Sequence, residues 1–205
     1  MAFLRGDGKA VLSRAIAAFE ATTAAELVIV VEPRAGHYAH IAVAAGAAAA
    51  FAALAFLLYG EPSFALHWFL IDPVLIGAFV GYLSGGWAPL ERALSRRSRR
   101  EAWALRCARA AFTARGVANT RGRTGVLLHV SVVERIATVI ADIGVIQAIP
   151  EAAWARACAP LREAVARGEP ATALEPTIMA LAALCGEHLP RQADDVNELS
   201  DEVDS

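Results

Sequence analysis

The chain has 205 residues, of which 57% are hydrophobic, and its formal net charge at pH 7 is −2. A chain of this length has little room to bury two long apolar helices in a soluble core, so long apolar runs in it favour a membrane protein. Its three cysteines, Cys107, Cys158 and Cys185, are far apart and odd in number, which argues against a disulfide framework and a CxxC metal site and fits a reducing compartment.

The first residues favour a folded element over a targeting signal. Residues 1–14 contain several charged side chains and lack the apolar stretch of a secretory signal. Residues 11–22 are predicted to form a helix, because Val11, Ile16 and Phe19 can share one face. The continuous apolar run at residues 27–31 predicts a buried strand that ends before Pro33.

Two apolar runs follow, at residues 41–59 and 68–88. The first has no charge and no proline, and the second has one acid, Asp72, near its start. About 20 apolar residues are needed for a helix to cross a bilayer. We therefore predict a transmembrane helical hairpin joined by residues 60–67. The alternative, a hairpin buried in a soluble core, fits the short chain less well.

Arginine indicates the orientation of this hairpin. The joining loop has no Lys or Arg, whereas five arginines follow the second run. The positive-inside rule then predicts an inner-membrane protein with both termini in the cytoplasm. The basic residues expected to face anionic lipid are Arg96, Arg97, Arg99 and Arg100. Nucleic acid is not an expected partner, because topology alone explains the cluster and no aromatic stacking platform accompanies it.

The second half predicts a long helix at residues 91–115, ended by Gly116. Strands are expected at residues 125–133 and 136–141, with a tight turn between them. The next helical pattern contains Pro160 and should kink or break there, and a last helix covers residues 177–188. Three strands and their covering helices predict an α/β fold, a small α/β/α sandwich with the two-helix transmembrane hairpin inserted.

The predicted organisation has four parts. Residues 1–37 are the first part of the sandwich, residues 38–89 the transmembrane hairpin, and residues 90–189 the second part of the sandwich. Residues 190–205 contain six acids, one base and no aromatic side chain, which predicts an acidic, disordered tail.

Several segments outside the hairpin resemble the TPM domain family, in particular its bacterial membrane members. They are residues 22–31, 120–128, 134–135 and 141–145, Trp154, and residues 194–199. The resemblance implies an α/β/α sandwich. The family includes a thylakoid acid phosphatase linked to photosystem repair and an auxiliary protein of an animal acetylcholine receptor, and many bacterial members have no assigned activity. The two prolines Pro160 and Pro176 and the inserted hairpin depart from the family pattern.

Small residues recur on one face of the second apolar run. Gly77, Gly81 and Gly85 are four residues apart, so helix backbones can approach closely along them. This face could pack against the first span or support a homo-oligomer. Asp72-Pro73 is interpreted as the start of a helix, with Asp72 as its N-cap, in preference to a membrane-buried acid.

Candidate metal ligands are carboxylates: Asp142 at a turn after a strand, and Asp194 and Asp195 in the tail. Such groups would suit Ca²⁺ or Mg²⁺, but ordinary turn chemistry for Asp142 and a solvated tail for the other two is the favoured interpretation. His129 has no evident His or Cys partner nearby, and no phosphate-binding loop or GxSxG motif is present. We therefore expect a membrane-anchored cytoplasmic TPM-like domain that interacts with other membrane proteins in their assembly or maintenance. The alternative is a metal-dependent phosphatase.

Overall fold

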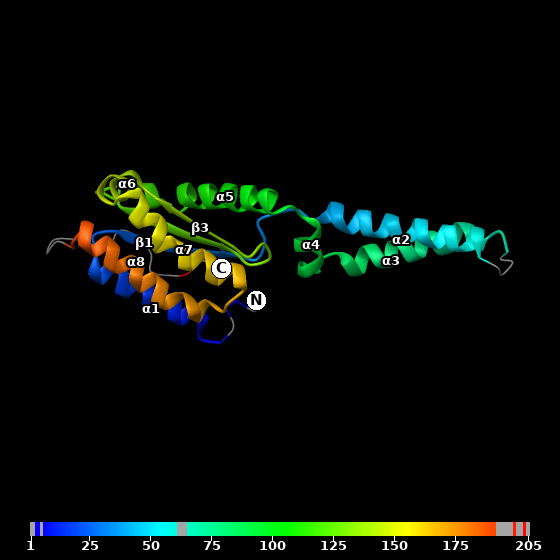
Figure 1. Ribbon diagram of the computed structural model, residues 1–205, viewed down its shortest axis with the longest axis horizontal. Coiled ribbons are helices and arrows are strands. Elements are labelled where there is room, and N and C mark those ends of the chain that lie inside the picture. Colours follow the sequence, from blue (N-terminus) through cyan, green and yellow to red (C-terminus); the bar gives the residue numbers. More distant parts are fainter. Residues whose placement is uncertain (1–2, 5, 61–64, 192–198, 200–202, 204–205) are drawn as a thin grey trace. The chain divides into compact units, whose positions relative to one another are not determined.

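The computed structural model describes residues 3–4, 6–60, 65–191, 199 and 203 (Figure 1). Its contacts divide the chain into two compact units. One comprises Met1–Ala35 with Ser98–Ser205, and the other comprises Gly36–Arg97. The sequence-based division placed residues 90–97 with the sandwich, whereas their contacts place them with the hairpin.

The first unit is a small, mostly helical α/β fold around a three-stranded mixed sheet in the order β1-β2-β3. Strand β1 (Glu26–Glu32) is parallel to β2 (Gly125–Ser131), with Glu26 opposite Gly125. Strand β3 (Ile136–Ala141) is antiparallel to β2. The helices of this unit are α1 (Gly8–Thr22), α5 (Arg97–Ala114), α6 (Ile143–Ala148), α7 (Glu151–Arg167) and α8 (Glu175–His188), with short 3-10 turns η1 (Val117–Asn119) and η2 (Ala171–Leu174).

Alternating side chains of the strands build a core on each face of the sheet. Leu128 and its neighbours on one face pack against α1, α7 and α8, whose largest buried side chain is Phe19. Leu127 on the other face packs with Ala108 of α5 and Val117. Figure 1 shows α5 on one side of the sheet and α1, α7 and α8 on the other. Each fully buried large apolar side chain contributes about 1.5–3 kcal/mol, so both faces stabilise this fold.

The second unit contains α2 (Ala39–Tyr59), α3 (Trp68–Ser84) and the short helix α4 (Ala88–Leu94). The predicted helix over residues 91–115 is therefore wrong, because α4 and α5 are separate helices. Ser95 between them has an extended backbone and its hydroxyl donates to the carbonyl oxygen of Glu91. A serine side chain that bonds to the preceding turn competes with the helical backbone, which explains the break.

The expected helix break at Pro160 and the expected N-cap at Asp72 are wrong, whereas a kink at Pro160 stays a prediction. Helix α7 continues through Pro160, which is exposed. The carbonyl that loses its N–H partner there can bond to water, so the helix tolerates the proline. Helix α3 begins at Trp68, which leaves Asp72 inside the helix and not at its N-cap.

Some residues of the tail that was predicted to be disordered contact the α/β unit. Pro190 forms a β-bridge with Thr23, and the Arg191 guanidinium donates to the backbone oxygen of Glu20. Val203 is 1% exposed within the core that contains Leu128. The acidic composition predicted a tail without contacts to the domain. Composition does not show that one apolar side chain, that of Val203, packs in the core.

Candidate functional sites

The hairpin unit contains an apolar helix of membrane-spanning length. At 1.5 Å per residue, α2 is about 32 Å long and α3 only about 25 Å, against a hydrocarbon core of about 30 Å. By length and composition α2 qualifies as a candidate span with a mean hydropathy of 2.4. A second candidate exists only if α3 and α4, bent by 97° relative to one another, are counted as one span.

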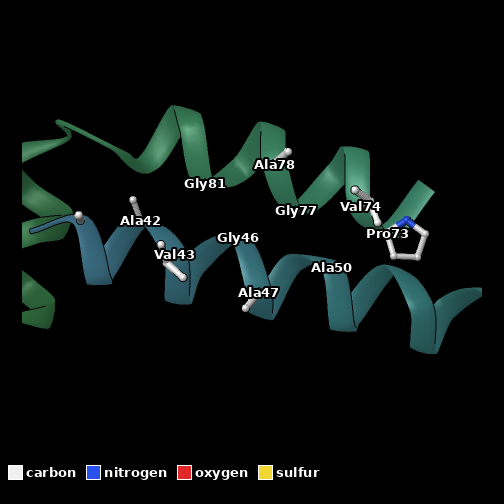
Figure 2. A pocket seen from close by; sticks show the side chains of 11 residues that line it. Ala42, Val43, Gly46, Ala47, Ala50, Pro73, Val74, Gly77, Ala78 and Gly81 are labelled. Carbon is white, nitrogen blue, oxygen red and sulfur yellow. The ribbon is translucent and has the colours of Figure 1, made fainter. Parts of the chain in front are cut away.

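The glycines of α3 lie against α2, as Figure 2 shows for Gly77 and Gly81. A Cβ atom added at Gly77 would be 2.8 Å from the carbonyl oxygen of Gly46 and 2.8 Å from the Cβ of Ala50. A Cβ added at Gly81 would be 3.2 Å from the carbonyl oxygen of Ala42. Carbon contacts are optimal at about 3.5–4.0 Å. Any residue larger than glycine at position 77 would therefore force one of the two helices to shift.

Gly85 has a different place from the other two glycines. It follows the last residue of α3, and its N–H donates to the carbonyl oxygens of Gly81 and Tyr82. A Cβ there would make only ordinary contacts. Along the α2–α3 contact runs an open groove of about 570 Å³ lined by small and aliphatic residues. Within the described helices, the close approach therefore belongs to Gly46, Gly77 and Gly81.

The outer surfaces of α2 and α3 are apolar and uncovered in this unit. Phe51 is 75% exposed on α2, and Leu70 is 75% exposed on α3. Only 17% of the most apolar stretch of α2 is buried. A core helix of a soluble protein buries such side chains, whereas a helix that is apolar all round fits a lipid environment.

The four basic residues expected to face lipid are not equivalent. Arg96, Arg97 and Arg99 are exposed, and the Arg99 guanidinium lies 6.0 Å from the ring centre of Trp103. The Arg100 guanidinium instead donates to the backbone oxygen of Glu134, with an Nη1···O distance of 3.0 Å. Arg100 is thus engaged by the α/β unit and is less available to a lipid headgroup.

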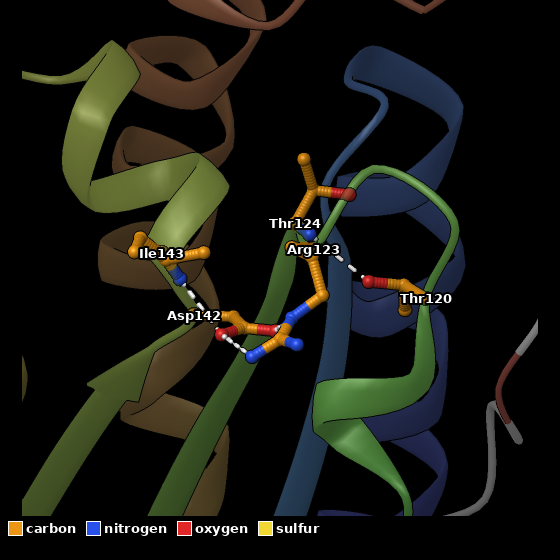
Figure 3. A network of polar contacts seen from close by, with 5 residues as sticks. All are labelled: Thr120, Arg123, Thr124, Asp142 and Ile143. Carbon is orange, nitrogen blue, oxygen red and sulfur yellow. Dashed lines mark hydrogen bonds and ion pairs between the residues drawn. The ribbon is translucent and has the colours of Figure 1, made fainter.

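Asp142 lies where β3 ends and α6 begins, and its carboxylate is bound by two partners (Figure 3). Arg123 makes a two-pronged ion pair, with Nε 2.6 Å from Oδ2 and Nη2 3.0 Å from Oδ1. The backbone N–H of Ile143 donates to Oδ1 at 2.7 Å, which makes Asp142 the N-cap of α6. The hydrogen bonds from Arg123 are the main cause that lowers the pKa of Asp142.

The loop that carries Arg123 is fixed by its threonines. The hydroxyl of Thr120 accepts from the N–H of Thr124 at 2.9 Å, and the hydroxyl of Thr124 donates to the carbonyl oxygen of Ala24 at 3.0 Å. Arg123 itself has a φ of 53°, a left-handed conformation that is uncommon for a residue other than glycine. Residues 120–124 thus tie the starts of β1 and β2 to the end of β3.

The predicted metal ligands are not brought together by the described part of the chain. Asp142 is held as above, so a cation at this carboxylate would have to displace Arg123. Asp194 and Asp195 lie outside the described residues. Among those that are described, no group of three or more His, Cys, Asp and Glu side chains could hold a metal ion.

A second polar cluster, which sequence reasoning missed, lies at the opposite end of the sheet under α5. His129 is fully buried on the face of β2 that Leu127 shares, and its Nε2 is 3.3 Å from a carboxylate oxygen of Glu32. Within the described chain neither of its ring nitrogens has a well-formed hydrogen bond. Glu134, in the turn between β2 and β3, is also fully buried.

This cluster contains the backbone at the end of the first chain segment of the α/β unit. The N–H of Ala35 donates to the Glu134 carboxylate at 3.1 Å, and the thiol of Cys107 is 3.7 Å from the carbonyl oxygen of Ala35. Arg100, near the start of the second segment, binds the backbone of the same Glu134. Glu134 therefore joins the two places where the chain leaves and re-enters this unit. No sequence signal pairs it with Ala35, which is remote along the chain.

The titratable groups of this cluster are not poised for nucleophilic chemistry. Burial, followed by the nearby Glu32, raises the pKa of the Cys107 thiol, which disfavours a thiolate. Burial lowers the pKa of His129, and Glu32 opposes this effect only in part. Burial also raises the pKa of Cys158 to about 11 and that of Cys185 to about 12. The arrangement thus fits a structural joint better than a catalytic dyad.

Comparison with known proteins supports the class of fold and no finer assignment. No protein-family model matches the sequence, and no curated protein matches it. The NMR structure of the BA42 protein from the psychrophilic bacterium Bizionia argentinensis is similar, with a TM-score of 0.60 and 14% sequence identity. The match covers 98% of this chain and 94% of BA42. At this identity the likeness shows a shared small α/β fold alone.

Proposed function

We propose that this chain is a membrane-anchored protein in which α2 and α3 form a transmembrane hairpin and the α/β unit is a TPM-like α/β/α sandwich. The observation that supports this proposal is the apolar, uncovered surface of α2, with side chains such as Phe51 exposed. Such a surface in water would favour aggregation. Lipid would cover it at no such cost.

The proposed orientation places both termini in the cytoplasm of a cell whose inner membrane holds the hairpin. The exposed arginines Arg96, Arg97 and Arg99 support it, because Lys and Arg beside a span are retained on the cytoplasmic side. The connecting loop has no base to oppose them. Near an anionic surface each arginine adds about 1 kcal/mol of attraction.

In this proposal the cytoplasmic domain acts by interaction, in the assembly or maintenance of other membrane proteins. The resemblance to the TPM family supports such a role. Two features of the α/β unit agree with it: the Asp142 carboxylate caps a helix and pairs with Arg123, and the pKa directions of Cys107 and His129 disfavour a nucleophile and its base.

Membrane fractionation and cysteine labelling test the anchoring and its orientation. The full chain should remain in the membrane pellet after alkaline carbonate washing. In a variant without native cysteines, an impermeant thiol reagent applied to intact cells should label Ser63→Cys and spare Ser205→Cys. Release by carbonate would refute the anchor, and the reverse labelling pattern would refute the orientation alone.

Co-purification in mild detergent tests the interaction role. The tagged full chain should enrich a reproducible set of membrane proteins over an unrelated tagged protein with two spans, as measured by quantitative mass spectrometry. Enrichment equal to that of the control protein would count against the interaction proposal and would leave the anchoring result untouched.

A further inference from the structure

An apolar groove of about 440 Å³ crosses the α/β unit at β3. Its lining includes Leu105 of α5, Val139 of β3 and Ile146 of α6. Leu105 is 38% exposed and Ile146 is 64% exposed. Isolated apolar side chains on a surface need no explanation, whereas apolar side chains gathered in one concave place mark a binding surface.

Two opposite charges line this groove, one on each side of the sheet. Arg109 belongs to α5 and Glu151 is the first residue of α7, and these helices cover opposite faces of the sheet (Figure 1). Both residues are exposed. Within the described part of the chain, neither Arg109 nor Glu151 forms an ion pair. An occupant of the groove therefore meets a base on the α5 side and an acid on the α7 side.

The shape of the groove favours a protein occupant over a small molecule. Pockets for small molecules bury about 70–90% of the surface of the ligand. A groove whose lining includes a side chain as exposed as Ile146 is too shallow to enclose a ligand in this way. A protein segment fits it, because a larger partner covers the exposed side chains from outside.

A lipid surface fits the groove less well than a protein does. An anionic membrane would meet the carboxylate of Glu151 at close range. The chain also leaves the α/β unit after Ala35, beyond the end of β1 that pairs with Ser131. The groove is lined by Ala141, which pairs with Val126 near the other end of β2.

The groove is not suited to an added strand. The middle of the outer edge of β3 is covered, since Ala137 is 6% exposed and Val139 is 9% exposed. The polar side chains of the lining are those of Arg109, Glu151 and Trp154. A segment bound there must satisfy its own backbone N–H and C=O groups, which an α-helix does internally. Helices bind such grooves through apolar side chains at positions i, i+3, i+4 and i+7.

We propose that this groove binds an amphipathic helix of a protein partner, with an acidic flank toward Arg109 and a basic flank toward Glu151. Such docking rests on the interaction role proposed above and names the surface through which the α/β unit acts. The two opposite charges set the direction of the bound helix, because a reversed helix would bring like charges together.

The probe is a labelled synthetic helix of about 18 residues, long enough for several turns, with Leu on its apolar face, Asp along one flank and Lys along the other. Its binding to the full chain in phosphatidylcholine nanodiscs is measured by fluorescence anisotropy, with empty nanodiscs as the blank. Ile146→Asn should raise the dissociation constant about tenfold or more, because the helix loses an apolar contact. Ile143→Asn is the matched control, since Ile143 is 51% exposed on the same helix and does not line the groove.

The second test reverses the charge on one side of the groove. A second peptide carries Lys on both flanks. Wild type should prefer the first peptide and Arg109→Glu should prefer the second, each by about fivefold or more, because like charges facing each other weaken binding. Arg106→Glu is the matched control and should keep the preference of wild type. It makes the same change in net charge at an exposed position of α5 outside the groove.

A third peptide, with proline at two central positions, cannot remain helical and should bind about tenfold more weakly than the first. Absence of binding to wild type, equal binding to Ile146→Asn and Ile143→Asn, or a reversed preference in Arg106→Glu as well would each overturn the proposal. Equal binding of the proline peptide would also overturn it and would assign the groove to an extended segment. Peptide binding can fail while the chain still co-purifies with membrane proteins, so the two proposals fail separately.

Discussion

The close approach of α2 and α3 predicts that Gly77→Leu destabilises the hairpin. At this position a Cβ atom would be 2.8 Å from both the carbonyl oxygen of Gly46 and the Cβ of Ala50. Neither atom is at the end of a flexible side chain, so the clash cannot be relieved by a rotamer change. The helices have to separate by about 1 Å to restore carbon contacts of about 3.5–4.0 Å.

The expected cost follows from that separation. A gap of 0.5–1 Å forfeits about a quarter to a half of each contact's dispersion energy, and overpacking of a well-packed site typically costs about 1–3 kcal/mol. On an open helix face the same substitution would be neutral or favourable, because glycine is about 1 kcal/mol worse than a good helix former. The sign of the change therefore separates a packed face from a lipid-facing one.

The assay is equilibrium unfolding in mixed micelles with increasing dodecyl sulfate. Tryptophan fluorescence reports on the hairpin through Trp68 and Trp87 when Trp103 and Trp154 are replaced by Phe. Ala78→Leu is the matched control, because Ala78 is the next residue of α3 and is exposed. We expect Gly77→Leu to unfold at a lower dodecyl sulfate fraction than this control, with a free energy of unfolding that is lower by about 1–3 kcal/mol. Equal midpoints would show that the reasoning about the α2–α3 contact is wrong.

Three further predictions concern the α/β unit. Burial lowers the pKa of His129 below its ordinary value of 6.5, so the unfolded chain binds a proton more readily, and stability that is present above pH 6.5 is lost as pH falls toward the folded pKa. The melting temperature should therefore drop between pH 7.5 and pH 5, and it should drop by less in His129→Gln. An equal drop in wild type and variant would assign the effect to other groups. Leu128→Asp places a charge at a 1% exposed core position and should lower the free energy of unfolding by at least about 3 kcal/mol, which makes the unit sensitive to limited proteolysis. Ile143→Asp, at an exposed position, should leave protease resistance unchanged. Equal resistance in the two variants would contradict the burial of β2. For the phosphatase alternative, turnover of a generic phosphoester should require Mg²⁺ or Ca²⁺ and fall in Asp142→Asn, and turnover that survives both chelation and the substitution would rule out Asp142 as the metal site.

Local patterns sufficed for the strands and for most helices. The apolar run that contains Ile29 predicted β1. The strand predicted at residues 125–133 contains β2, which ends at Ser131, and residues 136–141 were predicted with the bounds that β3 has. These elements follow from side-chain period and burial, which are properties of short segments. The same reasoning predicted α2, because a long uncharged apolar run has few alternatives to a helix.

Only the tertiary structure decided which polar groups meet. Asp142 was singled out as a ligand from its turn position, yet the loop geometry at Arg123 makes it a helix cap in an ion pair. The contacts of Glu134 with Ala35 and Arg100 join segments far apart in the chain, which no local pattern encodes. Pro160 and Ser95 show the limit of local propensity. The break predicted at Pro160 does not occur, because the proline is exposed and α7 continues through it, whereas α4 ends at Ser95, where no break was predicted. Sequence by itself determined the elements and the apolar character of the hairpin, because these depend on neighbouring residues. Partners of buried polar groups depend on how the elements pack, because that packing brings together residues remote in sequence.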